Sequence, residues 1–436
     1  MKRYETPDDV AFALARWAPK GIKKILDPAV GTGILIKPFL RRLVNNKGIV
    51  YCVDIDGKVL EFVDDFLSPH LGDSLNLINK DFLDIESNDI VVEDDKLFDC
   101  IVMNPPFSGQ RKEWREVKIP ATTKSPELVK KLPIESVFIV NAVQFLRPQG
   151  RILAILPASV ISGKASECVR QYLLNIGKIS HVHELSKFTF KKVEARVYLF
   201  VFEKSTKTKP IKLHNHRLKN PDNIVLSPCS LEDGMRLDYR FYAAKQWFDN
   251  LQLRSSNAGW IPLSDLADVY RGNASSPHGV NSAIHTTDYR NGRWNHQRVK
   301  NVEGNIGPYV VQPNDFLLKR IGRNCQKSLG MLTGTHGGGC TDCVYIVRPK
   351  SEDRKKQLFF ALRTILSFKQ IEGLILRGSG AEYITLADLE QLNIPINIAD
   401  IYPDIYSRYY SASVRGQIHK ISKYEGLIQR KLIECI

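Results

Sequence analysis

The sequence lacks any run of about eighteen apolar residues, the length that a membrane-spanning helix needs. Its first residues, 1–7, also lack the apolar core of a secretory signal. Both absences predict a cytoplasmic protein with no membrane partner. Cysteine is sparse, with 8 residues in 436, scattered mostly through apolar stretches. Such thiols are expected to be buried and reduced, so we predict no disulfides.

Residues spaced like the ligands of a metal ion are also few. Only Cys340 and Cys343 are spaced like zinc ligands, and Cys325 and His336 are near enough in sequence to complete a set of four. No second pair of this kind accompanies them, and the segment has the pattern of a strand. We therefore expect no metal site.

Acidic residues are outnumbered, because 47 Asp and Glu face 62 Lys and Arg, for a formal net charge of +15. This surplus favours a polyanionic partner such as nucleic acid or an acidic membrane surface. A chain of 436 residues exceeds what one hydrophobic core usually holds, so two domains are expected. The hydrophobic fraction of 43% is that of an ordinary globular protein and indicates no particular chemistry.

Residues 1–204 alternate short apolar runs with helical patterns, which predicts an α/β domain. We expect a doubly wound, Rossmann-like parallel sheet with helices on both faces. The expected strands are 24–26, 49–54, 76–78, 98–103, 150–156, 179–184 and 197–203. The expected helices are 8–17, 35–43, 58–66, 134–146 and 166–175. Such sheets bind ligands beyond the carboxyl ends of their strands, so functional residues should follow the strands.

The pattern changes beyond residue 204. A polar, Lys-rich stretch at 204–210 predicts a linker, and we assign 205–257 as a connecting segment. Residues 258–436 contain short strands separated by Gly, Asn and Pro, which indicates a second, β-rich α+β domain. At its end, residues 413–433 have an apolar face at helical spacing, and this C-terminal helix is expected to pack against the second domain.

Three strand ends carry residues suited to an adenosine-bearing ligand. The first strand runs into a turn whose glycines allow a ligand to approach the backbone closely, Asp27-Pro28-Ala29-Val30-Gly31-Thr32-Gly33. The next strand ends at Asp54, 21 residues after Gly33, where a carboxylate could accept both hydroxyls of a ribose. The third is followed by Asp81 and Phe82, a carboxylate and a ring that would suit adenine.

The fourth strand runs straight into Asn104-Pro105-Pro106-Phe107. The two prolines fix the backbone and have no N–H groups, so the Asn104 amide and the Pro105 carbonyl can present oxygen acceptors. The exocyclic amine of adenine is a poor nucleophile, and two acceptors on its hydrogens would favour a tetrahedral, attacking nitrogen. Phe107 could stack on the target ring, which must first leave the duplex. This turn predicts methyl transfer to an amine without a conventional base.

In this order the motifs resemble those of the gamma-class N6-adenine DNA methyltransferases, the TaqI-like group. The resemblance implies S-adenosylmethionine (AdoMet) as cofactor, with Thr6 and Pro7 matching an element that closes over its methionine end. It implies further cofactor contacts from Asp27, Pro28, Ala29, Gly31, Gly33, Asp54, Asp81, Phe82 and Asn104. The catalytic residues would be Asn104, Pro105, Pro106 and Phe107.

The resemblance also implies an aromatic ring on the other face of the extruded adenine. Phe188 matches that ring, with Phe190 as second candidate. Stacking between Phe107 and Phe188 would stabilise the extruded base by about 1–3 kcal/mol per contact. The chain departs from the family at Phe107, where tyrosine is common, and no counterpart assigns a role to the segment 109–131.

The second domain resembles the target-recognition domains of type I restriction specificity subunits, through residues 260–272, 313–322 and 378–389. That resemblance implies side chains that read bases in the major groove. The candidates for DNA contact are Arg271, Asn273, Arg290, Arg293 and Arg298.

The sequence thus predicts a sequence-specific DNA adenine N6-methyltransferase of a restriction-modification system. Its expected partners are double-stranded DNA and a cognate restriction endonuclease, and the protein could be a monomer or a dimer. Two alternatives stay open. One keeps the chemistry but changes the acceptor to an RNA adenine or a protein glutamine; the other is a non-catalytic DNA-specificity subunit that kept the fold.

Overall fold

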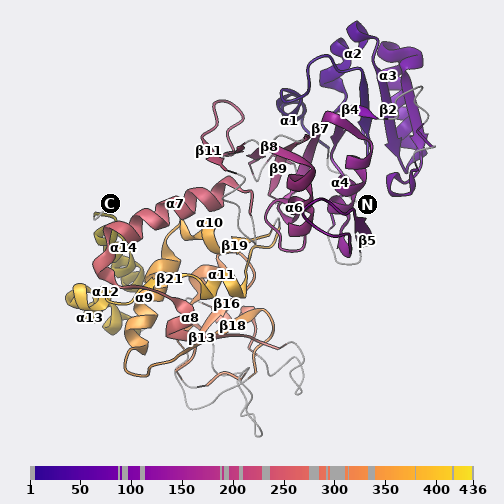
Figure 1. The fold of residues 1–436 in the computed structure, drawn as a ribbon. Helices are drawn as coiled ribbons and strands as arrows, with labels where there is room; N and C mark the ends of the chain where they lie inside the picture. Colours follow the sequence, from indigo (N-terminus) through magenta and orange to yellow (C-terminus); the bar gives the residue numbers. More distant parts are fainter. Residues whose placement is uncertain are drawn as a thin grey trace. The chain divides into compact units, whose positions relative to one another are not determined.

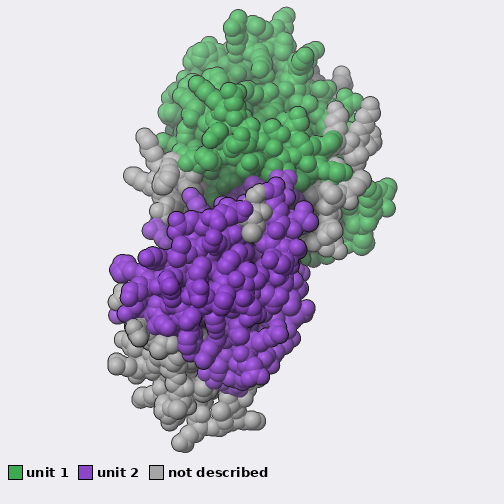
Figure 2. Space-filling model, turned by 90° about the vertical axis from the view of Figure 1, so that its left-hand side faces the viewer, with its two compact units in different colours: residues 1–239, 378–380 green, residues 240–377, 381–436 purple. Residues whose placement is uncertain are grey.

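The structure is a computed structural model of the 436-residue chain. It describes residues 5–86, 89–90, 97–108, 113–186, 189–190, 196–205, 210–227, 236–273, 284–290, 293–294, 310–312, 314–331, 339–378, 380–414 and 417–434. The chain forms two compact units: unit 1 comprises residues 1–239 and 378–380, and unit 2 comprises 240–377 and 381–436 (Figure 2). None of the described helices has both the length and the apolar character needed to cross a membrane.

Unit 1 is built on a mixed sheet with the strand order β11-β10-β8-β9-β7-β4-β1-β2-β3 (Figure 1). β1, β2, β3, β4 and β7 are parallel, as predicted. β9 runs antiparallel to both β7 and β8, so the sheet is mixed and the prediction of a wholly parallel sheet was wrong. All six residues of the central strand β4 are buried, as expected of a strand covered on both faces. The strands are β1 (Lys24–Asp27), β2 (Ile49–Asp54), β3 (Leu75–Asn79), β4 (Phe98–Met103), β7 (Leu146–Pro157), β8 (Gly177–Glu184), β9 (Val197–Lys204), β10 (Ile211–His214) and β11 (Asn223–Leu226).

Helices cover this sheet. On one face, sheet residues such as Ile25, Cys52 and Leu153 pack against Leu14 and Val63 of the helices α1 and α3 in one buried cluster. The helices of unit 1 are α1 (Asp8–Ala15), α2 (Leu40–Asn46), α3 (Gly57–Leu71), α4 (Ile134–Gln144), α5 (Ala158–Ile161) and α6 (Glu167–Ile176), with short 3₁₀ turns η1 (Lys37–Phe39), η2 (Gly72–Ser74) and η3 (Phe82–Asp84). The predicted α/β fold class is confirmed, with every expected strand and helix of residues 1–204 present to within a few residues.

A hairpin between β4 and α4 was not predicted. Its strands β5 (Trp114–Ile119) and β6 (Leu128–Pro133) pair antiparallel, and the hairpin overlaps most of the segment 109–131, to which no role was assigned from the sequence. The α6 residue Asn175 donates from Nδ2 to the hydroxyls of Thr122 and Ser125 in the hairpin turn, at 3.3 and 3.4 Å. These bonds anchor the end of the hairpin to unit 1.

The predicted connecting segment 205–257 is not a separate part of the chain. Its strands β10 and β11 extend the sheet of unit 1, because β10 pairs parallel with β8 and antiparallel with β11. Its last part forms helix α7 (Tyr239–Arg254), which lies almost entirely in unit 2. The boundary between the units therefore falls at residues 239 and 240, well after the expected linker at 204–210.

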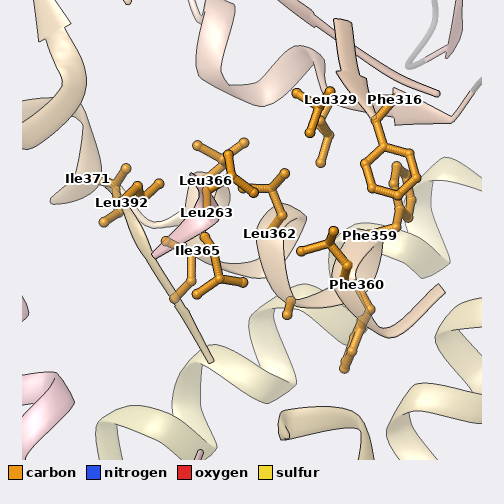
Figure 3. Close-up of a cluster of buried hydrophobic side chains, with 14 of the residues drawn as sticks. Leu263, Phe316, Leu329, Phe359, Phe360, Leu362, Ile365, Leu366, Ile371 and Leu392 are labelled. Carbon is orange, nitrogen blue, oxygen red and sulfur yellow. The ribbon is translucent and has the colours of Figure 1, made fainter. Parts of the chain in front are cut away.

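Unit 2 combines small sheets with helices, as the sequence predicted. A four-stranded sheet has the order β13-β18-β16-β17, and β12 pairs with β21. The helix α9 provides much of the core, where Phe359 meets Phe316 edge-on with ring centroids 5.2 Å apart (Figure 3). The other elements are β12 (Trp260–Pro262), α8 (Leu263–Leu266), β13 (Ala267–Arg271), β14 (Tyr289–Arg290), β15 (Arg293–Trp294), β16 (Phe316–Lys319), β17 (Gly330–Met331), β18 (Val344–Pro349), α9 (Lys355–Ser367), α10 (Ile371–Ile375), β19 (Leu376–Arg377), β20 (Tyr383–Ile384), α11 (Leu386–Glu390), β21 (Asn393–Pro395), α12 (Ile398–Ile401), α13 (Pro403–Val414) and α14 (Ile418–Glu434).

The C-terminal region holds two helices, α13 and α14, where one helix at 413–433 was expected. Ile421, Ile428 and Leu432 of α14 belong to the same buried cluster as α9, so the predicted packing against the second domain is confirmed. An ion pair strengthens this contact, since the Arg363 guanidinium on α9 donates to the Glu425 carboxylate at 2.5 Å.

Candidate active site

The loop after β1 is held by backbone bonds and by a carboxylate from the next strand. Gly31 and Gly33 have φ angles of 52° and 72°, a left-handed conformation that glycine adopts without strain. The Gly31 N–H donates to Asp54 Oδ2 at 3.1 Å, and the Val30 N–H donates to the Val53 carbonyl at 3.0 Å. The predicted cofactor loop and the predicted ribose acid are therefore in direct contact at the carboxyl ends of β1 and β2.

Asp27, at the end of β1, is fully buried. Its Oδ1 accepts from the Ala29 N–H at 3.1 Å, whereas its buried Oδ2 has no hydrogen-bond partner. Burial disfavours the ionised form and raises the pKa of Asp27 to about 8; the Ala29 bond opposes this shift, and the nearby Asp54 adds to it. Burial, together with Asp27, also raises the pKa of the Cys52 thiol. At neutral pH this carboxyl group therefore favours its protonated, uncharged form.

This raised pKa predicts a pH dependence of stability. Because the folded pKa lies above the unfolded one, the contribution of Asp27 is fully present below about pH 4 and is lost as pH rises through about 8. In the ligand-free protein, the free energy of unfolding should therefore fall by up to about 1.4 kcal/mol per pH unit between these limits. Urea titrations at pH 5 to 9 should show this slope in the wild type and lose it in Asp27→Asn. Asp73 is exposed, so the control Asp73→Asn should keep the same decrease of the free energy of unfolding with pH. An equal decrease in all three proteins would contradict a neutral Asp27.

Asp54 is partly exposed and holds the end of β2 in a defined shape. Its Oδ1 accepts from the Asp56 N–H at 3.0 Å, and Asp56 in turn caps helix α3 by accepting from Lys58 N at 3.1 Å. Between them, Ile55 is 72% exposed. Ile55 was not among the predicted site residues, although a large aliphatic residue between two aspartates directly after a strand could have indicated an apolar ligand surface.

The predicted adenine pair after β3 divides into two environments. Asp81 is partly exposed and caps η3, with Oδ1 accepting from the Leu83 N–H at 3.0 Å. Phe82 is only 2% exposed, and its ring lies 5.4 Å from that of Phe138 and 5.8 Å from that of Phe145. In this structure Phe82 therefore packs within the protein, and Ile55 is the apolar side chain exposed near the ends of these strands.

The turn after β4 meets the N-terminal element. The Asn104 Nδ2 donates to the Thr6 hydroxyl at 3.1 Å, joining residues 98 positions apart. Thr6 is buried, and the Pro7 carbonyl accepts from Val10 N at 3.1 Å in the first turn of α1, which holds this element in place. No described group donates to Asn104 Oδ1. The contact with Thr6 thus engages the amide nitrogen of Asn104 and not its oxygen.

The remainder of the turn is partly covered. Pro105 is buried, and Phe107 is partly buried and packs against the cluster that contains the helices α1 to α3. Immediately after it, Ser108 donates from its backbone N–H and its hydroxyl to the Glu135 carboxylate, at 2.9 and 3.2 Å. Glu135 lies in the first turn of α4, and no sequence pattern predicted this contact.

The predicted second stacking residue, Phe188, lies outside the described residues. Its alternate, Phe190, is buried in the same cluster as the helices α1 to α3, which is the position of a core residue.

A family model described as N-6 DNA Methylase matches residues 2–224. The chain belongs to this family. It is 30% identical over 184 residues to the type II methyltransferase M.BsuBI of Bacillus subtilis, an alignment covering 37% of this chain and 34% of that protein. The type II methyltransferase M.AccI of Acinetobacter calcoaceticus is 23% identical over 189 residues, covering 41% of this chain and 32% of that protein. The chain thus spans about a third of the length of these two relatives.

Among solved structures, the type IIG restriction endonuclease BpuSI is similar with a TM-score of 0.46 and 14% sequence identity, covering 92% of this chain and 58% of that one. In this N-6 DNA methylase family member, the residues matched by the family model end within unit 1. Unit 2 therefore lies beyond the family match.

The residues predicted to contact DNA lie in unit 2, in different surroundings. Arg271 is 52% exposed but pairs with Asp342 at 2.9 Å, and Asn273 is exposed. Arg290 is exposed, and its Nε donates to the Thr287 carbonyl at 3.1 Å. The backbone of Arg293 pairs with Arg290 in the two-stranded β14–β15 sheet, and Arg298 lies outside the described residues. Among the candidates that the structure describes, Arg290 and Arg293 are thus neighbours on paired strands.

The segment with zinc-like spacing has other contacts. The Cys340 thiol is buried in a hydrophobic cluster, and burial raises its pKa well above the usual range. The Cys343 thiol donates to Asp342 at 3.4 Å. Within the described ranges, no group of three or more His, Cys, Asp or Glu side chains could hold a metal ion. His336 lies outside those ranges. The six described cysteines are free thiols.

Proposed function

We propose that the chain is a sequence-specific DNA methyltransferase that moves a methyl group from AdoMet to the N6 amine of adenine. Family membership, two type II methyltransferase relatives and the geometry of the turn at Asn104 support this proposal. The contact between Asn104 and Thr6 supports it most directly. That bond uses the nitrogen of the amide, so the oxygen is oriented as an acceptor and not as a donor.

An acceptor is what an exocyclic amine requires. The lone pair of the adenine N6 is delocalised into the ring, and nitrogen attacks well only when its geometry becomes tetrahedral. Asn104 Oδ1 and the Pro105 carbonyl would each accept one amine hydrogen and hold the nitrogen in that geometry. AdoMet, when bound, supplies a methyl group on a positively charged sulfur. The prolines restrict the turn, so the two acceptors lose little freedom when the amine arrives.

The residues around the glycine loop fit AdoMet. Asp27 offers a buried oxygen without a hydrogen-bond partner, and a cationic ligand would favour its ionised form. A Cβ atom at Gly31 would meet no atom within 4 Å, so the loop has open space beside it. Asp54 would accept from the ribose hydroxyls, while Ile55 and Asp81 would contact the adenine ring and its edge.

The target base would be extruded from the duplex, because its amine is not accessible to an enzyme within the stack. We assign stacking on the extruded ring to Phe107, and to Phe188 on the other face. Sequence recognition is assigned to unit 2, with Arg271, Asn273, Arg290, Arg293 and Arg298 as candidates for DNA contact. A cognate restriction endonuclease is the expected partner, since the two curated relatives are described as type II methyltransferases.

Transfer of labelled methyl groups to competing acceptors tests this proposal. Purified protein is incubated with tritiated AdoMet and equal masses of mixed-sequence plasmid DNA, RNA and a protein lysate, and the products are digested and separated. We expect label in N6-methyladenine from DNA. Label in RNA adenine or in protein glutamine would support the first alternative, whereas DNA binding without any transfer would support a non-catalytic specificity subunit.

A further inference from the structure

We infer that Glu135 is a positioning residue for methyl transfer, and that its carboxylate holds the Asn104–Phe107 turn from its C-terminal side. The inference rests on the proposed function, because it assigns a role within that reaction. Glu135 is only 1% exposed and accepts three hydrogen bonds: from Ser108 N at 2.9 Å, from Ser108 Oγ at 3.2 Å and from Ser159 Oγ at 2.6 Å. Two of these three bonds go to the residue that directly follows Phe107.

Burying a carboxylate removes its hydration, and neighbouring groups offset that free-energy cost at Glu135. Three donors surround the two oxygens, and the first turn of α4 adds the positive end of the helix dipole. A neutral or apolar residue would avoid the desolvation of a charge at this position. We therefore infer that Glu135 is present for the strength and direction of its hydrogen bonds to Ser108, despite the free-energy cost of burying a carboxylate.

Few backbone donors are available to hold the turn in place by hydrogen bonds. Pro105 and Pro106 have no backbone N–H, so Phe107 and Ser108 supply the only backbone donors of residues 105–108. Glu135 accepts from the Ser108 donor, and Thr6 accepts from the Asn104 side chain at the other end of the turn. The two acceptors that would grip the amine, Asn104 Oδ1 and the Pro105 carbonyl, lie between these two attachments.

Ser159 connects Glu135 to a second strand end of the sheet. It lies on α5, which directly follows β7, and Glu135 links it to the segment that follows β4. Since β4 and β7 are neighbouring strands, the carboxylate joins the ends of two strands at the edge where the reaction is proposed. A shift of about 1 Å in a reacting group can lower a rate by about 10²-fold, so loss of this link should act on the rate of chemistry.

The test compares Glu135→Ala, Glu135→Gln and the matched control Ser136→Ala. Ser136 is the next residue of α4 and is fully buried, and its hydroxyl bonds to that of Ser166 at 2.9 Å. We expect the single-turnover rate of Glu135→Ala to fall about 10²-fold, with the Kd for AdoMet unchanged within about threefold. Glu135→Gln keeps one acceptor oxygen and should restore the rate to within about tenfold of wild type. Ser136→Ala should stay within about threefold of wild type.

Amide hydrogen exchange provides a second measurement that needs no methyl transfer. Exchange of the peptide containing Ser108 should accelerate at least about tenfold in Glu135→Ala and remain unchanged in Ser136→Ala. If the wild type transferred no methyl group to DNA, the proposed function would be refuted. The exchange result would still decide whether Glu135 holds the turn through Ser108. Unchanged exchange, or a Glu135→Ala rate equal to that of wild type, would overturn the inference.

Discussion

Asn104→Ala is expected to lower the rate of methyl transfer by about 10²- to 10³-fold while leaving DNA binding intact. The variant removes one of the two oxygen acceptors proposed to hold the adenine amine, and the loss of one such preorganised group typically has an effect of this size. It also removes the bond to Thr6, which orients the amide. Single-turnover assays with tritiated AdoMet and saturating DNA measure the rate, and gel-shift titration measures DNA binding.

Thr6→Val is the matched control for this prediction. It keeps Asn104 but leaves its Nδ2 without the hydroxyl that accepts from it, so the amide loses its orientation and the rate should fall by roughly tenfold. An Asn104→Ala variant with wild-type turnover would show that the turn does not act on the amine. A larger loss in Thr6→Val than in Asn104→Ala would assign the main role to the N-terminal element instead.

Asp54→Ala is expected to weaken AdoMet binding by about 10²-fold. The variant lacks the carboxylate that is proposed to accept from the ribose hydroxyls. Hydrogen bonds to charged groups contribute about 1.5–3 kcal/mol each to the free energy of such an interaction. The Gly31 N–H would also lose its acceptor, so the glycine loop would be less well ordered before the ligand binds. Isothermal titration of AdoMet into the purified protein measures the change in Kd.

Asp56→Ala provides the comparison within the same turn. It removes the acceptor for Lys58 N at the start of α3, and loss of such a cap destabilises a protein by about 1 kcal/mol. Its Kd for AdoMet should nevertheless stay within about threefold of wild type. If Asp56→Ala weakened binding as much as Asp54→Ala, the effect would come from the shape of the turn and not from a ribose contact.

The sequence was sufficient to predict seven strands of the sheet of unit 1 and the residues at its edge, but not β10, β11 or the antiparallel direction of β9. Asp27, Asp54 and Asn104 each end or follow an apolar run, and in a parallel sheet the carboxyl ends of such strands meet at one edge. Asp27 and Asp54, which are far apart in sequence, were therefore expected near each other, and Gly31 indeed bonds to Asp54. Thr6 was placed near the cofactor only through the resemblance to a family, and its contact with Asn104 was not predicted.

Other features have no local signal. The hairpin β5–β6 carries many charged residues and little alternation, so no pattern distinguishes its strands from a loop. β10 and β11 have only four residues each, and they join the sheet because β10 pairs with β8 and β11 pairs with β10. The contact of Glu135 with Ser108 spans 27 residues, and nothing near either residue indicates it. Phe82 looks like a ligand-binding ring in sequence but packs against Phe138 and Phe145.

The central claim is that the turn at Asn104 delivers methyl groups to adenine in DNA, and base-resolved mapping of the product tests it most directly. Wild type and Asn104→Ala are incubated with AdoMet and unmethylated plasmid DNA of mixed sequence, and modified bases are mapped by single-molecule sequencing. We predict N6-methyladenine within one short recurring sequence for the wild type and none for the variant. Methylation of cytosine, or an identical methyladenine map from Asn104→Ala, would contradict the claim.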